Sequence, residues 1–406
     1  MKINYNLTFC IYFIFFGITS CTLNPIVFIP GDGGSQLEAK LNKSSVVHYV
    51  CEKSTSGFFN IWLNLELLVP LVIDCWVDNV KLNYDNVTRK TFNQPGVETR
   101  IPGFGSSETV EWLDPSHAST GAYFKYIGDI LVKLGHERNI TIKGAPYDFR
   151  KAPKTYCADE NQEYFENLKN LIETAYDENG NQSVMLIAHS MGGPMSLQLL
   201  SRQKQSWKDK YIKCLITLAG AWGGSVKAVK VYAIGDDLGS YALRESVMKQ
   251  EQITSPSLSW MLPNQYFWDK DEVLVQTSKK NFSLSNIEEY FRSLNFPIGW
   301  EMRKDTLPYQ QGNIAPGVEV HCLFGVNITT VERLYYKPGT WLDGYPTLIN
   351  GDGDGTVNRR SLEGCLRWSK MQSQPVHYQA FPKVDHMGIL KEQAVLNYIS
   401  NLINSV

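Results

Sequence analysis

The sequence predicts an α/β fold in which a mainly parallel sheet is covered by helices on both faces. Short, continuously apolar runs that are typical of buried strands alternate with amphipathic segments of helical period. One of the apolar runs leads through a serine-containing turn directly into a helix. The chain of 406 residues, 43% hydrophobic and 20% charged, has enough apolar material for one large domain with insertions.

The elements follow one another in a regular order. The first strand is predicted at residues 25–30, and the turn Gly31-Asp32-Gly33-Gly34 follows it. Further strands are predicted at residues 184–187, 214–218, 318–324 and 375–381. Helices are predicted at residues 116–134, at 162–176, from 193 onward and at 391–403. This alternation favours a parallel sheet over an antiparallel one.

Two regions depart from that alternation. Residues 48–80 include a strongly apolar stretch with Trp62 and Trp76, and residues 227–310 are long, irregular and aromatic-rich. Neither resembles an independent domain. We therefore expect one domain over residues 23–406 with two insertions, of which the second is a cap over the site.

The N-terminus predicts entry into the secretory pathway. Met1-Lys2 precedes an apolar stretch from Leu7 to Ile18, and small residues follow it, as in a cleaved signal peptide over residues 1–22. An uncleaved anchor is the alternative. Sequons of the form N-x-S/T then predict glycosylation at six asparagines, namely Asn42, Asn86, Asn139, Asn181, Asn281 and Asn327.

Six cysteines remain beyond the signal, at positions 51, 75, 157, 214, 322 and 365, and fifteen pairings are conceivable. Cys51 and Cys75 bracket the apolar stretch and are the natural first pair. Cys214 lies in a predicted strand and is interpreted as a buried free thiol.

The segment Ala188-His189-Ser190-Met191-Gly192 is the serine turn between strand and helix. A tight turn of small residues in that context is the nucleophile elbow of α/β-hydrolases, in which the serine is exposed on a strained turn. The pattern is A-x-S-x-G rather than G-x-S-x-G, and an ordinary turn serine is the alternative. We predict Ser190 as a nucleophile.

A serine nucleophile needs a base, and in this fold the acid and then the base follow the serine along the chain. Downstream of Ser190 lie His321, His377 and His386. The first two fall inside predicted strands and are interpreted as packed or strand-surface residues. His386 follows the last strand and precedes the final helix, where a base can reach the serine, so we predict it as the base.

The acid is expected in Gly351-Asp352-Gly353-Asp354-Gly355-Thr356-Val357, although the residues alone do not separate Asp352 from Asp354. The stretch should end a strand at the same edge of the sheet as the serine. A phosphatase of the haloacid dehalogenase type would need more chain after this motif. A calcium-binding EF-hand would need glycine where Val357 stands. A plain Gly/Asp turn is the remaining alternative.

The tetrahedral intermediate of acyl transfer needs two backbone N–H donors. Met191, which follows the nucleophile, should supply one, and the turn Gly31–Gly34 the other.

The chain resembles the lecithin:cholesterol acyltransferase family over nearly its whole mature length, and within it the branch of lysosomal (group XV) phospholipases A2. The matching stretches lie in the same order along the chain, at residues 30–32, 36–40, 60–66, 74–76, 101–105, 144–150, 188–192, 207–211, 351–358 and 385–386. Gly193-Pro194 and Gly33-Gly34-Ser35 depart from the branch.

This resemblance implies Ser190 as nucleophile, Asp354 as acid and His386 as base, with oxyanion amides on Asp32 and Met191. It also implies the disulfides Cys51–Cys75 and Cys322–Cys365, without partners for Cys157 and Cys214. The chemistry requires neither a metal nor a cofactor.

The apolar stretch from Phe58 to Ile73 could be mistaken for a transmembrane helix. Asn60, Glu66 and Pro70 argue against that, because each is costly or disruptive at the centre of a bilayer. A disulfide-bracketed apolar loop with tryptophans suits the membrane interface, and a core segment is the alternative. With the resemblance, we predict residues 48–80 as a membrane-binding or lid region that docks through Trp62, Leu63, Leu65, Leu67 and Leu68.

The expected function is hydrolysis of glycerophospholipid acyl esters through a serine acyl-enzyme, with transfer of the acyl group to water or to a lipophilic alcohol such as ceramide. The alternatives are a sterol or diacylglycerol acyltransferase and, from another class, a non-catalytic lipid-binding protein. We expect a monomer that meets lipid substrates at phospholipid membranes, in lysosomes or outside the cell. The net charge of −2 gives no reason to expect a nucleic-acid partner.

Overall fold

The computed structural model describes residues 23–69, 72–153, 162–239, 243–310, 312 and 314–405. The predicted signal peptide and Cys157 lie outside the described residues.

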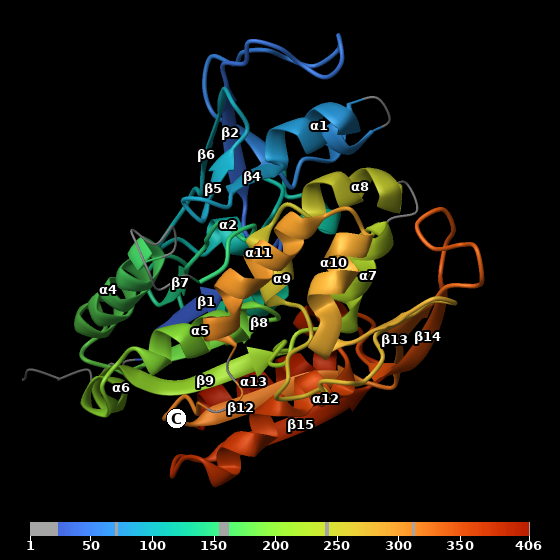
Figure 1. Cartoon of the computed structure of the whole chain (residues 1–406). Helices are drawn as coiled ribbons and strands as arrows, with labels where there is room; N and C mark the ends of the chain where they lie inside the picture. The colour runs from blue at the N-terminus through green and yellow to red at the C-terminus, as the bar shows by residue number, and fades with distance from the viewer. Residues whose placement is uncertain are drawn as a thin grey trace, which may run out of the picture.

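A parallel sheet forms the centre of the molecule, with strand order β15-β12-β9-β8-β1-β7 (Figure 1). Every neighbouring pair in it runs parallel. The strands are β1 Ile26–Ile29, β7 Ile142–Gly144, β8 Val184–His189, β9 Ile212–Leu218, β12 Val320–Val326 and β15 Val376–Pro382. The predicted parallel sheet is confirmed, and each of its five predicted strands lies within two residues of its expected bounds.

The side chains of β1 point alternately to the two faces of the sheet, and helices cover both faces. Val27 and Ile29 pack into one hydrophobic cluster together with residues of α4 and α5. Ile26 and Phe28 point to the opposite face and pack with residues of α3 and α13. Since all four side chains are fully buried, the strand is apolar without interruption.

The helices lie around this sheet and also contribute to two lobes beside it (Figure 1). Their bounds are α1 Ile73–Val80, α2 Glu108–Glu111, α3 Lys125–Lys133, α4 Gln162–Glu178, α5 Gly192–Ser201, α6 Gln205–Tyr211, α7 Val226–Ile234, α8 Glu245–Gln252, α9 Pro256–Trp260, α10 Ile287–Ser293, α11 Pro297–Thr306, α12 Arg359–Leu362 and α13 Gln393–Asn404. Short 3-10 turns lie at η1 Leu65–Leu68, η2 Ser119–Gly121, η3 Leu284–Asn286, η4 Leu307–Tyr309, η5 Glu363–Lys370 and η6 Gly388–Leu390.

The helix predicted at residues 116–134 forms only in its second half, as α3. His117 has a left-handed backbone with φ +60°, and Gly121 packs so closely on Asp114 that a Cβ there would lie 2.8 Å from the Asp114 Cβ. This folded-back turn ends before the helix begins at Lys125.

A first lobe stands above the sheet at the blue end of the chain (Figure 1). It contains β2 Leu37–Leu41, β3 Phe59–Trp62 and β6 Val97–Arg100 in one sheet, β4 Leu82–Asp85 and β5 Lys90–Asn93 in a hairpin, and α1. The buried Arg150 ties this lobe to the core, because it pairs with Asp148 at 2.7 Å and donates to the carbonyl of Val80 at 2.8 Å. Among the described residues, no helix has the length and apolarity to cross a bilayer.

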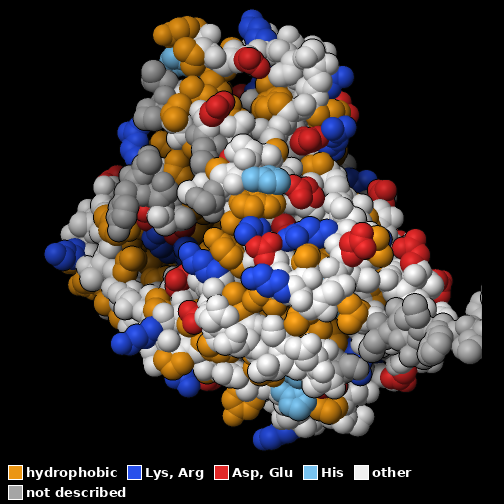
Figure 2. All heavy atoms as spheres, turned by 180° about the vertical axis from the view of Figure 1, so that it is seen from behind, with side chains coloured by type: hydrophobic (Ala, Val, Ile, Leu, Met, Phe, Trp, Pro, Cys, Tyr) orange, Lys and Arg blue, Asp and Glu red, His pale blue; other side chains and the backbone are white. Residues whose placement is uncertain are grey.

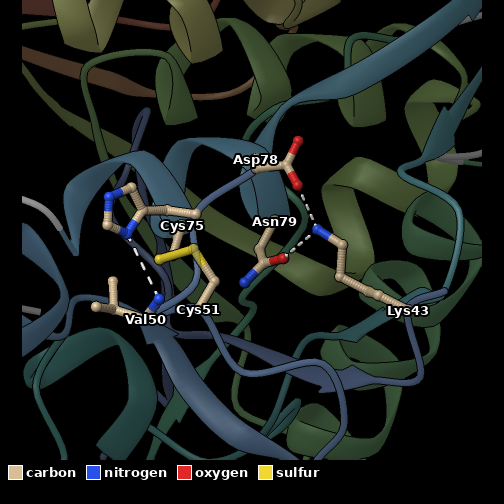
Figure 3. The surroundings of a disulfide bond; sticks show 7 residues. Lys43, Val50, Cys51, Cys75, Asp78 and Asn79 are labelled. Atoms are coloured by element: carbon tan, nitrogen blue, oxygen red, sulfur yellow. Dashed lines mark hydrogen bonds and ion pairs between the residues drawn. A yellow bond between two sulfur atoms is a disulfide. The ribbon is translucent and has the colours of Figure 1, made fainter. Parts of the chain in front are cut away.

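Both implied disulfides are confirmed. Cys51 bonds to Cys75 of α1 in the first lobe, beside the contacts of Lys43 with Asp78 and Asn79 (Figure 3). Cys322 in β12 bonds to Cys365 in η5. Cys214 is a buried free thiol, as interpreted from its strand.

A second lobe covers the other side of the sheet's carboxyl edge. It contains α7 to α11 and a mixed sheet of order β11-β10-β13-β14, with β10 Val275–Gln276, β11 Asn281–Phe282, β13 Ile328–Tyr335 and β14 Thr347–Gly353. Helix α7 packs on β13 through Val229, Val331 and their neighbours in one hydrophobic cluster.

The expectation that the strand before Asp354 belongs to the central sheet is wrong. β14 pairs antiparallel with β13 in the second sheet. The reason is that β13 continues β12 almost directly, so the hairpin carries the chain away from the central sheet and back again. An isolated bridge between Ile328 and Asp354 then brings Asp354 to the carboxyl end of β12.

Candidate active site

Ser190 stands between β8 and α5 in a strained backbone conformation with φ +53°. Its N–H donates to the carbonyl of Leu218 at 2.9 Å, which fixes the turn on the neighbouring strand. Small neighbours are required here, since a Cβ on Gly192 would lie 2.3 Å from the carbonyl oxygen of Ile29. The residues therefore form the tight strand–turn–helix that the pattern predicted.

His386 lies between Ser190 and Asp354. Its Nε2 is 2.9 Å from the Ser190 Oγ, and its Nδ1 is 2.7 Å from Asp354 Oδ2. The His386 N–H also donates to the Asp354 carbonyl at 2.9 Å, so backbone and side chain hold the imidazole together. All three residues are buried. The structure thus brings the predicted nucleophile, acid and base into one hydrogen-bonded chain.

Asp354 is held in its ionised form by its surroundings. Burial on its own would raise the pKa of the Asp354 carboxyl, but His386 and the N–H groups of Val357 and Thr356 outweigh burial and lower this pKa. Those two N–H groups donate to Oδ1 at 2.7 and 3.0 Å, leaving Oδ2 for the imidazole. A carboxylate in this position orients the histidine and stabilises its protonated form.

Asp352, the alternative acid, is turned away from His386. It accepts a hydrogen bond from the Asn327 N–H and pairs with Arg359 at 2.9 Å on the surface. His321 and His377 lie at the amino ends of β12 and β15, away from the carboxyl ends where Ser190 lies.

The first turn, Gly31-Asp32-Gly33-Gly34, lies against the nucleophile, because a Cβ on Gly31 would lie 2.7 Å from the Ser190 Cβ. Met191 precedes the first residue of α5, where N–H groups have no partner within the helix and the dipole favours negative charge. Part of Asp32 reaches the surface, but protein atoms surround its carboxyl, and this burial raises the pKa of Asp32 to about 6.

Two side chains whose contacts motif analysis did not predict, Tyr123 and His189, connect the turn Gly31–Gly34 to His386. The Gly31 N–H donates to the Tyr123 hydroxyl oxygen at 3.0 Å, and the Tyr123 hydroxyl contacts His189 Nδ1. His189 Nε2 is 2.9 Å from the carbonyl oxygen of His386. A carbonyl can only accept, so Nε2 carries the proton and Nδ1 accepts from Tyr123.

His189 keeps this arrangement because it stays neutral. Burial lowers the pKa of His189 to about 3, with a further contribution from the neighbouring His386. The sequence placed His189 in the elbow but gave no sign of its partners, since Tyr123 lies 66 residues away.

We predict that Tyr123→Phe lowers kcat about tenfold and leaves KM nearly unchanged. The substitution keeps the ring but leaves the Gly31 N–H and His189 Nδ1 without a buried partner, which costs about 1–3 kcal/mol of stability. Steady-state kinetics and thermal unfolding measure the two effects. Tyr126→Phe, on the exposed face of α3, is the matched control. Wild-type kcat in Tyr123→Phe would contradict the positioning role.

Comparison with known proteins identifies the family. The family model described as lecithin:cholesterol acyltransferase matches residues 58–393. The human protein named lysosomal phospholipase A and acyltransferase is 41% identical over 379 residues, which cover 93% of this chain and 90% of the human one. The chain belongs to the lecithin:cholesterol acyltransferase family.

Other relatives carry a second name within this family. The chicken (Gallus gallus) phosphatidylcholine-sterol acyltransferase is 40% identical over 366 residues, covering 90% of this chain and 87% of that protein. Among solved structures, the Tle4-Tli4 complex gives a TM-score of 0.50 at 11% identity, covering 94% of this chain and 98% of that one. That likeness concerns the fold alone, which is the α/β-hydrolase fold.

Proposed function

We propose that this chain is a serine phospholipase A and lipid O-acyltransferase of lysosomes or the extracellular space, reached through the secretory pathway. The hydrogen-bonded chain Ser190–His386–Asp354 at the carboxyl edge of the sheet carries the proposal. The relatives named lysosomal phospholipase A and acyltransferase, which match nearly the whole chain, support the substrate class.

The reaction starts on the acyl carbonyl of a glycerophospholipid. Ser190 Oγ attacks the carbonyl carbon while His386 Nε2 takes the hydroxyl proton, and Asp354 stabilises the resulting imidazolium. The N–H groups of Met191 and Asp32 hold the developing oxyanion. As the intermediate collapses, the proton on Nε2 passes to the leaving oxygen, and a lysophospholipid departs from an acyl-serine.

The second half-reaction releases the acyl group. Water or a lipophilic alcohol such as ceramide loses its proton to His386 Nε2 and attacks the acyl-serine carbonyl. Collapse of the second intermediate returns this proton to Ser190 Oγ. The products are a free fatty acid in hydrolysis and an acylated alcohol in transfer.

A small hollow lies between α5 and the cap helix α9. Its volume of about 10 Å³ is enough for a single water molecule and not for an acyl chain, so the site is closed between these helices. Its apolar lining comes from seven residues, Pro194, Leu197, Ala221, Trp222, Trp260, Met261 and Tyr309. We assign the region 227–310, which supplies Trp260, Met261 and Tyr309, as the cap over the site.

The first lobe is the proposed membrane-docking region, built from residues 48–80 and the loop before them. Trp62, Leu63, Leu67 and Leu68 are half-buried, and the Trp62 indole donates to the Gly33 carbonyl at 2.7 Å. Leu65 begins η1. The exposed large apolar side chains of the described part of residues 47–80 are Val47, Tyr49, Val50 and Val69, and the β4–β5 hairpin of the same lobe exposes Val87 and Phe92. Hydrophobic atoms also gather at the top of the molecule in the space-filling view (Figure 2).

The combined substitution Val47→Ser, Tyr49→Ser and Val50→Ser should therefore weaken binding to phosphatidylcholine vesicles at least tenfold, measured by vesicle sedimentation. Tyr49 is 88% exposed, so the fold should tolerate the change. Activity on a soluble short-chain ester should stay at the wild-type level, since these residues are remote from Ser190. The control is the combined substitution Leu342→Ser and Tyr345→Ser, at two exposed positions of the second lobe. Unchanged vesicle binding would contradict the docking surface.

The glycoprotein assignment is compatible with the surface. All six sequon asparagines are exposed, as acceptor positions must be.

The proposed function is tested by incubating the purified protein with phosphatidylcholine liposomes that contain ceramide, at about pH 4.5 and about pH 7.4. Free fatty acid and acylceramide formed faster at the lower pH support the proposal. Cholesteryl ester as the main product from cholesterol-containing liposomes would instead assign the sterol acyltransferase activity named for other relatives. A protein that binds the liposomes without forming any product would be a lipid-binding protein.

Asp32 should give the enzyme a preference for acid. With a pKa near 6, Asp32 is neutral below that pH and charged above it, where its charge repels the oxyanion forming beside it. The rate should fall as pH rises through about 6. The folded state raises the pKa of Asp32 above its usual 3.8, so the protonated carboxyl favours the folded state at low pH. This contribution to the free energy of unfolding is lost as the pH rises from 3.8 through about 6.

The ratio of kcat/KM at pH 7 to kcat/KM at pH 5 should therefore be about tenfold higher in Asp32→Asn than in wild type. A pH–rate profile of kcat/KM measures this ratio. The substitution preserves the backbone N–H that serves the oxyanion. Asp237→Asn, on the exposed loop after α7, is the matched control. An Asp32→Asn profile that superimposes on wild type would contradict this assignment.

A further inference from the structure

A cluster of three metal-ligating side chains lies at the end of the sheet opposite the nucleophile. Glu319, His321 and His377 each offer one ligand atom, and these atoms lie within 4.8 Å of one another. The reaction uses none of them, since Ser190 and His386 follow the carboxyl ends of their strands while these three lie at the amino ends of β12 and β15.

Sheet geometry places the three side chains together. Glu319 extends the ladder of β12, because its carbonyl accepts from the Leu215 N–H, and it shares a face with His321 two residues later. His377 is the register partner of His321 on the neighbouring β15, and parallel partners project to the same face. Two positions on one strand and one on its neighbour thus form a triad.

The distances suit a tetrahedral ion. Glu319 Oε1 lies 3.1 Å from His321 Nε2 and 3.4 Å from His377 Nε2. Zinc bonds of about 2.0–2.1 Å place two tetrahedral ligands about 3.3 Å apart. The imidazole rings of His321 and His377 stack with centroids 4.7 Å apart, so closure on an ion requires only that the exposed His377 ring tilts.

The surroundings also suit a ligand histidine. His321 Nδ1 is 2.8 Å from the Tyr398 hydroxyl on α13, which fixes the ring and presents Nε2 toward the carboxylate. Ligand histidines in metal sites are oriented by such partners on the other ring nitrogen. β15 is the edge strand of the central sheet, so solvent can reach the site and supply a fourth ligand.

We propose that Glu319, His321 and His377 bind Zn²⁺ as a structural ion. The ion ties the edge strand β15 to β12 and, through Tyr398, both strands to α13. Two imidazoles and one carboxylate favour zinc over magnesium or calcium, which prefer oxygen ligands alone. This assignment is independent of the proposed enzymatic function.

The test measures zinc binding by calorimetry and thermal unfolding of the full glycosylated protein at about pH 7.4, where protons compete little for imidazole. The wild type should bind one zinc ion more than His377→Ala and unfold at a higher temperature with zinc than without it. Glu319→Gln should weaken the same site at least tenfold. The comparison with His377→Ala excludes zinc held by His386, because that residue is unchanged.

His117→Ala is the control, because His117 is an exposed histidine that also contacts a carboxylate, that of Glu108. This variant should keep the wild-type zinc stoichiometry, and magnesium should leave the unfolding temperature of every variant unchanged. Cobalt should give the visible absorption of a tetrahedral site in wild type and lose it in His377→Ala. Equal zinc stoichiometry and equal thermal shifts in wild type and His377→Ala would overturn the proposal.

Discussion

Ser190→Ala should lower kcat for both hydrolysis and acyl transfer by about 10⁴- to 10⁶-fold. The variant removes the atom that attacks the ester, while the oxyanion donors and the acid–base pair remain in place. Its fold should be unchanged, because alanine carries the same Cβ as serine and meets the same strain at φ +53°. Phosphatidylcholine hydrolysis and the thermal unfolding temperature of the purified variant measure the two parts of this prediction.

A fluorophosphonate probe adds a direct readout of the nucleophile. The wild type should be labelled at Ser190, and the variant should not be labelled at all. Ser201→Ala, at the end of the same helix α5, should keep full activity and labelling. Activity above about one per cent of wild type in Ser190→Ala would contradict the acyl-enzyme mechanism. A phosphatase built on the Asp352–Asp354 motif would instead depend on magnesium and ignore the probe.

Much of the central fold could be predicted because its signals are local. β8 is apolar over five residues, β9 is buried over its last five, and Pro194 marks the first turn of α5. The position of β7 could not be predicted, since three residues of mixed character carry no period. Its place in the sheet depends on pairing with β1, which is a contact between distant parts of the chain.

The candidate site was predictable in its chain order but not in all its contacts. The Ser–Asp–His order indicated Ser190 and His386, because the turn and the final loop each have a local signature. The residues alone leave Asp352 and Asp354 equivalent, the family resemblance implies Asp354, and the fold gives the physical reason. The hairpin β13–β14 turns Asp352 toward Arg359 at the surface and Asp354 toward His386.

The insertions show a further limit of pattern analysis. The disulfide-bracketed apolar stretch around Trp62 favoured a membrane interface, yet the Trp62 indole donates to the Gly33 carbonyl and packs near Trp76 and Phe149. One apolar segment can therefore contribute side chains both to the core and to the surface. The direction of the Trp62 side chain follows from the register between β3 and β2. This pairing contains a bulge at Leu37.

Asp354→Asn should lower kcat by about 10⁴-fold while the geometry of the site is preserved. The amide oxygen of the asparagine can keep the hydrogen bonds from the Val357 and Thr356 N–H groups. Its NH₂ group then faces His386 Nδ1 and must donate to it. The proton of the neutral imidazole is displaced to Nε2, which can no longer accept the Ser190 proton. The loss therefore comes from the wrong tautomer and not from a lost contact.

Asp352→Asn is the matched control, since it makes the same change two residues earlier in the chain. Asp352 pairs with the exposed Arg359, and a surface ion pair contributes about 0–1 kcal/mol to stability. Its kcat should stay within about twofold of wild type, measured on the same phosphatidylcholine substrate. If the two variants lost activity equally, or if Asp352→Asn lost more, the hydrogen bond between Asp354 and His386 would not be the one that orients the base. A single pair of variants thus distinguishes two aspartates that the sequence alone leaves equivalent.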